Sequence, residues 1–122
     1  MVEGTLIAES MRVGAELEGV RLVVRKIRRS PQGDVPAGQP DLWTLIEFEA
    51  EERSAGLLAY ALAGVLDTDN GWYADFRTPA ETFVIYSGRV FRYPRGDSQG
   101  RAEAEAYGRS VCVPDSELDW PV

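Results

Sequence analysis

The residues best suited to chemistry lie in one short stretch, where an acid stands between a phenol and a guanidinium. Tyr73, Asp75 and Arg77 occupy alternate positions, so in a β-strand their side chains point to the same face. An arginine beside an aspartate holds the acid ionised, or the two together bind a polar ligand. The same row also arises as an ordinary ion pair on a solvated sheet. Both interpretations remain open at this stage.

A second group of candidates comes later in the chain, at Arg92, Tyr93 and Arg95. If Arg92 reaches the face of Asp75, the site becomes a cationic pocket with tyrosine walls, which suits a carboxylate or a phosphate. This segment also leads into a helix N-terminus, where free amides hold anions, but Asp97 occupies that position as a cap. The candidate residues for binding a ligand or partner are Tyr73, Asp75, Arg77, Arg92, Tyr93 and Arg95.

The chain has no histidine and a single cysteine, Cys112. This excludes Ser-His-Asp and Cys-His nucleophiles and HExxH zinc sites. Without a histidine to activate it, Cys112 is interpreted as a small apolar residue packed at a helix end. Residues 67–71 resemble the start of a calcium loop, but Trp72 stands where an EF-hand requires glycine. We therefore expect no metal and no cofactor and assign no catalytic residue; an enzyme would have to use Asp75.

Five basic residues fall within one ten-residue span that includes most of the second predicted strand. The cluster consists of Arg21, Arg25, Lys26, Arg28 and Arg29. Such a cluster is typical of nucleic-acid binding. However, 20 acidic side chains against 13 basic ones give a net charge of -7, which repels polyanions. Pairing with Glu47 and Glu49 on the next strand would account for much of the cluster, so nucleic acid is not an expected partner.

A sheet with two helices must position these side chains. Period-two alternation predicts strands over 5–11, 20–28, 42–49, 71–77, 82–86 and 89–93. Three- and four-residue apolar spacing predicts a helix over 52–66, and a cap at Asp97 or Ser98 predicts another over 98–110. Ser87-Gly88 is a two-residue hairpin turn. In the expected hairpin both faces carry large apolar groups, which is the reason to expect a homodimer.

The order β-β-β-α-β-β-β-α predicts an α+β fold, namely a two-layer sandwich with a mostly antiparallel sheet. The unit from Leu42 to Arg77 is a candidate parallel crossover within that sheet. We expect one domain over 1–122, with a flexible Pro/Gly loop at 30–40. The first residues lack the features of a secretory signal and no apolar run is long enough to span a bilayer, which predicts a cytoplasmic protein with no membrane partner.

Four segments resemble a group of small uncharacterised bacterial proteins over nearly the whole chain. They are Gly71–Phe76, Val90–Asp97, Tyr107–Ser110 and Leu118–Trp120. The resemblance implies a bacterial, stand-alone, cytoplasmic domain and gives no role to any residue. The chain departs from the group at Cys112, where a helix-ending glycine is expected.

Two functional hypotheses follow from these observations. The first is a non-enzymatic binding or protein-interaction module that holds a small anionic ligand or a protein partner. The alternative is a small histidine-independent enzyme in which Asp75 acts as general base and an arginine steadies an anionic intermediate. The enzyme hypothesis requires that Asp75 line a concave pocket.

Overall fold

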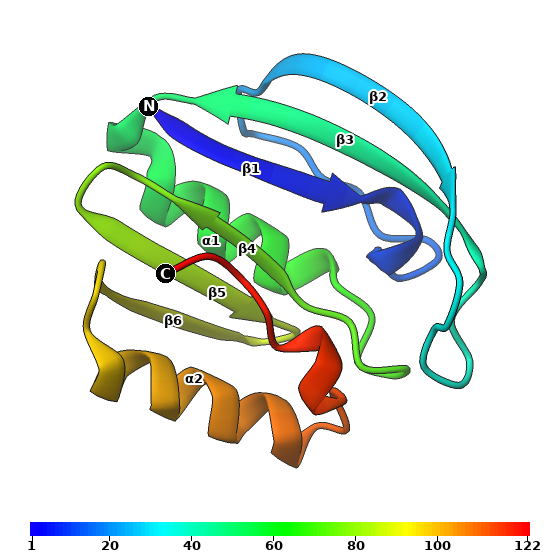
Figure 1. The fold of residues 1–122 in the computed structure, drawn as a ribbon. Coiled ribbons are helices and arrows are strands. Elements are labelled where there is room, and N and C mark those ends of the chain that lie inside the picture. The colour runs from blue at the N-terminus through cyan, green and yellow to red at the C-terminus, as the bar shows by residue number, and fades with distance from the viewer.

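The computed structural model describes residues 1–122 as an α+β fold with one six-stranded antiparallel sheet. The strands are β1 (Val2–Ile7), β2 (Val23–Pro31), β3 (Leu42–Ala50), β4 (Ala74–Arg77), β5 (Glu81–Tyr86) and β6 (Arg89–Pro94). The helices are α1 (Ala55–Val65) and α2 (Ser98–Ser110), with short 3-10 turns η1 (Ala8–Ser10), η2 (Glu52–Ser54) and η3 (Asp115–Glu117). Neither helix has the length and apolar character that crossing a membrane requires. The strand order across the sheet is β2-β3-β1-β4-β5-β6 (Figure 1).

The expected α+β class is confirmed, and the expected order of elements is confirmed in part, since three short 3-10 turns stand among the strands and helices. The central position of β1 is the feature that the sequence did not predict. Since β1 is antiparallel to both β3 and β4, those two strands run in the same direction without being neighbours. The connection from β3 through α1 to β4 therefore joins two parallel strands with β1 between them, and no two adjacent strands are parallel.

The two helices cover opposite faces of the sheet, as the alternation of side chains along β5 shows. Phe83 and Ile85 belong to the core that contains α1, whereas Val84 and Tyr86 belong to a second core with α2 and the C-terminal tail. In Figure 1 the tail, drawn in red, crosses the sheet on the side of α2. The second core involves only β5 and β6 among the strands. The two-layer sandwich is thus only partly confirmed, because a third layer covers one half of the sheet.

The Ser87-Gly88 hairpin forms with the predicted register, including the pairs Val84 with Phe91 and Phe83 with Arg92. Gly88 has φ 73°, a left-handed conformation that glycine adopts without strain. Both apolar faces of the hairpin are covered by helices of the same chain. The observation that led us to expect a homodimer is therefore accounted for within one protomer.

The end of α2 explains the unusual position of Cys112. The Val113 amide donates to the Gly108 carbonyl and the Cys112 amide to that of Arg109, which is the pattern of a Schellman cap. This cap places Cys112 at φ 69°, where a glycine is normally found. The expectation that Cys112 is packed at the helix end is wrong, because its side chain is exposed; Val113 is the buried residue of the cap.

Candidate functional site

The half of the sheet that α2 leaves uncovered carries two adjoining cavities, of about 330 and 540 Å³, on the face opposite α1. Both cavities are lined by Thr5 of β1, Glu47 of β3 and Asp75 of β4, so we treat them as one groove. The tail contributes Glu117 and Asp119 to the smaller cavity and Pro121 to the larger one. The groove volume lies in the range typical of small-molecule sites.

Asp75 stands at the junction of the two cavities because of the alternation along β4. Ala74 and Phe76 are buried in the α1 core, so Asp75 and Arg77 point to the groove. The Asp75 side chain is 27% exposed, its carboxylate lies 3.7 Å from Arg77 Nη1, and no hydrogen bond within the chain reaches it. Burial, and then the charge of Asp119, raise its pKa, while the guanidiniums of Arg77 and Arg101 act against the rise.

Two tryptophans form the apolar end of the smaller cavity. The ring centroids of Trp43 and Trp72 lie 5.5 Å apart at an interplanar angle of 55°. The indole of Trp43 donates to the Pro40 carbonyl over 2.9 Å, which fixes its orientation. Gln39 also lines this end; its amide nitrogen donates to the Asn70 carbonyl, and its buried Oε1 has no partner.

Trp72 and Tyr73 both line the groove, although strict alternation predicted that they face opposite ways. The reason is that β4 begins at Ala74 rather than at Gly71. Asn70 and Gly71 both have φ 70°, so the chain turns before it enters the strand. The left-handed conformation is normal for Gly71 and tolerated by asparagine.

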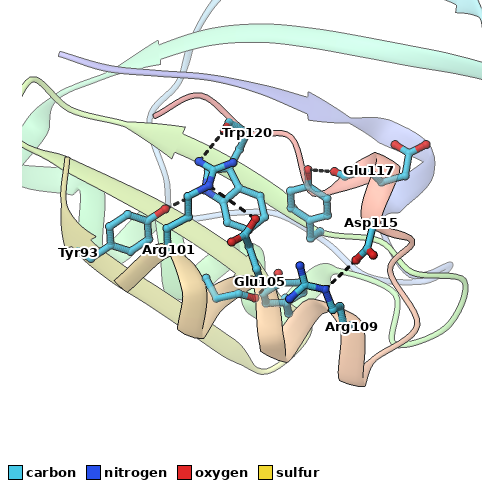
Figure 2. A network of polar contacts seen from close by, with 10 residues as sticks. Tyr93, Arg101, Glu105, Arg109, Asp115, Glu117 and Trp120 are labelled. Atoms are coloured by element: carbon cyan, nitrogen blue, oxygen red, sulfur yellow. Dashed lines mark hydrogen bonds and ion pairs between the residues drawn. The ribbon is translucent and has the colours of Figure 1, made fainter. Parts of the chain in front are cut away.

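The C-terminal tail, residues 111–122, lines one side of the groove and is fixed by hydrogen bonds at two adjacent places. The hydroxyl of Tyr73 donates to the Glu117 carbonyl. The second place is Trp120 (Figure 2). Its indole donates to the Tyr93 hydroxyl over 2.8 Å, and its backbone carbonyl accepts from the Arg101 guanidinium over 2.8 Å. The Arg101 guanidinium also lies 4.8 Å from the centre of the Trp120 ring, within cation–π distance.

One ion pair ties the tail to α2, and a second lies within the helix (Figure 2). Arg109 donates to the Asp115 carboxylate over 2.7 Å, and Arg101 lies 3.7 Å from Glu105 one turn along the helix. With its main chain anchored, the tail turns the carboxylate of Glu117 toward the groove. Burial, followed by the charge of Asp119, raises the pKa of Glu117.

The groove carries an excess of negative charge. It is lined by six carboxylates and three guanidiniums: Glu3, Glu47, Glu49, Asp75, Glu117 and Asp119 against Arg25, Arg28 and Arg77. Two of the guanidiniums already lie beside a carboxylate, since Arg25 is 3.4 Å from Glu49 and Arg77 is 3.7 Å from Asp75. The field in the groove therefore attracts cations and repels anions. Across the chain, no group of three or more acidic or cysteine side chains is arranged to hold a metal ion.

The structure brings together only three of the six candidate residues. Tyr73, Asp75 and Arg77 lie at the groove. Arg92 points to the face of α1, where it donates two hydrogen bonds to Glu81 over 2.7 and 2.8 Å and lies 5.0 Å from the centre of the Phe83 ring.

The remaining two candidates also stand apart from the groove. Tyr93 is buried in the core beneath α2, with its hydroxyl taken by Trp120. Arg95 is exposed in the turn before α2. The expected convergence of Arg92 and Asp75 therefore does not occur.

The groove residues that sequence reasoning missed are the paired tryptophans and the acids of the tail. Glu117 and Asp119 alternate with Leu118 and Trp120, which are buried. This alternation is visible in the sequence and is typical of a segment with one packed face. The partner of Trp72, in contrast, comes from β3 and could be found only from the fold.

Comparisons with known proteins leave the interpretation to the geometry. No family model, no curated protein and no solved structure matches the chain. The groove must therefore be understood from its own shape, charge and unpaired groups.

Proposed function

We propose that the protein is a binding module whose groove holds a small organic cation with an apolar part. The observation that carries the proposal is the state of Asp75. A partly buried carboxylate that accepts no hydrogen bond from the chain and has one arginine at 3.7 Å is incompletely compensated within the protein. A ligand with N–H donors supplies the missing hydrogen bonds, and a charged donor makes them stronger.

The ligand's apolar part is assigned to the tryptophan end of the groove. Trp43, which is half-buried, and Trp72, which is 6% exposed, both line the smaller cavity beside its acids. Aromatic faces bind both aliphatic groups and cations, with a gain of roughly 0.5–2 kcal/mol for a cation over a ring. An alkyl- or arylammonium compound satisfies both ends, with its nitrogen at Asp75 and its carbon skeleton on the indoles.

This proposal changes the sign of the ligand expected from the sequence. The anionic ligand depended on a cationic pocket with Arg92 beside Asp75, and Arg92 pairs with Glu81 on the other face. The carboxylates of the groove outnumber its guanidiniums. Both facts support a cation.

A second candidate function, acid–base catalysis by Asp75, is favoured by one observation. Asp75 lines a concave site and has a raised pKa, which is typical of a general base. Arg77, the residue available to steady an anionic intermediate, is already the partner of Asp75. Binding without turnover therefore agrees better with the geometry.

The test is a titration with benzylammonium at low ionic strength, followed by tryptophan fluorescence and by amide shifts in NMR spectra. Benzyl alcohol and benzoate have similar shapes but lack the positive charge. We expect benzylammonium to bind most tightly and Asp75→Asn to weaken it about 10- to 100-fold, because a hydrogen bond to a charged group contributes about 1.5–3 kcal/mol.

Asp34→Asn is the matched control, since Asp34 is exposed and lies outside the groove. It removes the same charge from the chain and should leave the affinity unchanged. Tighter binding of benzoate, or equal losses in the two variants, would refute the proposal. Conversion of the bound amine would favour the enzyme.

A further inference from the structure

The free edge of strand β2 is the second surface that the fold leaves without a partner. β2 is the terminal strand of the sheet and pairs only with β3. Its nine residues, Val23–Pro31, are exposed except for Ser30, which is half-buried. A long, exposed edge is a template on which another extended chain forms hydrogen bonds.

The backbone of β2 has amides available for such a chain. The Gln32 amide donates to the Asp41 carbonyl over 2.6 Å. By the alternation of an antiparallel ladder, Lys26, Arg28 and Ser30 then direct their amides to β3. The amides of Ile27 and Arg29 point outward. Pro31, which has no amide hydrogen, falls on the outward-facing side, where a proline costs no ladder bond.

The side chains of β2 favour an acidic occupant. Arg25 lies 3.4 Å from Glu49, but Lys26, Arg28 and Arg29 form no ion pair. The expectation that the glutamates of β3 account for much of this cluster is met in part: Arg25 forms an ion pair with Glu49, and Lys26 lies opposite Glu47 in the ladder without one. Three cations without an ion pair therefore stand along one edge of a chain whose net charge is -7.

The two faces of β2 carry different side chains, and this difference predicts which residues should alternate along a partner strand. Lys26 and Arg28 pair across the ladder with Glu47 and Leu45, which line the groove. On the other face, Val24 is 49% and Ile27 63% exposed. A strand added beside β2 would meet cations on one face and aliphatic groups, together with Arg29, on the other.

We propose that the edge of β2 binds an extended acidic segment of a partner protein, in which acidic and β-branched apolar residues alternate, as a seventh strand of the sheet. A second copy of the chain fits less well, because antiparallel pairing of β2 with itself about Ile27 sets Lys26 against Arg28. Nucleic acid is disfavoured because β2 has no aromatic side chain on which bases could stack. The proposal does not depend on the ligand of the groove.

The experiment measures binding of a fluorescently labelled peptide of about eight residues, alternating Glu with Val, a usual strand length. Anisotropy at low ionic strength gives the affinity, and NMR shifts should map to β2. The Lys26→Glu/Arg29→Glu variant should bind about tenfold more weakly, because two attractions become repulsions. Arg53→Glu/Arg95→Glu is the matched control; it makes the same charge change at exposed sites away from β2 and should lose far less affinity.

A second arm separates strand addition from simple charge attraction. Ile27→Pro removes an outward amide without changing the charge, and we expect a loss of at least about fivefold. The complementary probe is the same peptide with N-methylated valines, which tests the same hydrogen bonds on wild-type protein even if Ile27→Pro fails to fold. Equal affinity for the methylated and unmethylated peptides would overturn the proposal. Tighter binding of single-stranded oligo-dT than of the acidic peptide would also overturn it and assign the edge to nucleic acid.

Discussion

The replacement Gly108→Ala tests how the second core and the wall of the groove are built. A Cβ added at Gly108 would lie 2.6 Å from the Tyr86 hydroxyl oxygen and 2.8 Å from Leu118 Cδ2. Tyr86 cannot retreat easily, because it is 1% exposed and its hydroxyl donates to the Ala104 carbonyl over 2.8 Å. Leu118 belongs to the tail, between the two acids that line the groove. The added methyl group therefore presses on the core and on the groove wall together.

The expected change is a loss of about 1–3 kcal/mol in the free energy of unfolding. Alanine gains about 1 kcal/mol over glycine in a helix interior. Overpacking costs about 1–3 kcal/mol, and the strained or lost Tyr86 hydrogen bond adds about 1 kcal/mol. Gly64→Ala in α1 is the matched control. No atom lies within 4 Å of a Cβ at Gly64, so this variant keeps the helix gain without the clash and should gain up to about 1 kcal/mol.

Urea unfolding followed by circular dichroism and tryptophan fluorescence measures both variants, and thermal unfolding should show a shift of roughly 3–6 °C per kcal/mol. The two substitutions are expected to change stability in opposite directions. If Gly108→Ala were as stable as Gly64→Ala, the close packing of α2 on Tyr86 would be wrong. Because Leu118 lies between Glu117 and Asp119, Gly108→Ala should also weaken benzylammonium binding, whereas Gly64→Ala should not.

Two other predictions concern backbone strain and protonation. Cys112→Gly should stabilise the protein by about 0.5–1 kcal/mol. Glycine adopts φ 69° without the penalty of about 1–2 kcal/mol that a side chain carries there, and the greater chain entropy that glycine loses on folding offsets part of this gain. A lower urea midpoint for Cys112→Gly would contradict the Schellman cap. Burial raises the pKa of Asp75 above its ordinary 3.8, so the folded state binds the proton more tightly and its stability falls as pH rises from 3.8 through the raised pKa. Asp75→Asn removes this dependence, so its stability relative to wild type should increase over that interval; urea midpoints measured at several pH values check this, and a constant difference would refute it.

The elements that the sequence predicts best are those whose signals are local. The hairpin register follows from Ser87-Gly88 and from alternation on either side, and it matches the structure pair by pair. The helix over 98–110 follows from its cap, and the Asp97 carboxylate does accept from the amides of Gln99 and Gly100. Turn chemistry and capping act within a few residues, so they can be recognised without the fold.

The features that could not be predicted depend on contacts distant in the chain. β1 is inserted between β3 and β4, and this insertion sets which side chains share the groove. The position of Arg92 illustrates the difficulty. Its face follows correctly from the hairpin register, but whether that face also holds Asp75 depends on the pairing of β4 with β5. Asp75 pairs with Val84, not with Phe83, so Arg92 lies on the opposite side of the sheet.

The groove exists because the second core extends over only part of the sheet. α2 and the tail need β5 and β6 to bury Tyr86, Tyr93 and Trp120, and the tail then passes along the boundary of the covered half, where its acids line the groove. Beyond that boundary, the second face of β1 and β3 lines the groove together with the loop that carries Gln39 and the tail itself. A strand face in a small sheet is normally either packed or polar. Here the face is polar, but it is also concave, contains a tryptophan pair and carries a carboxylate that accepts no hydrogen bond from the chain, and this combination is the basis of the proposed ligand site.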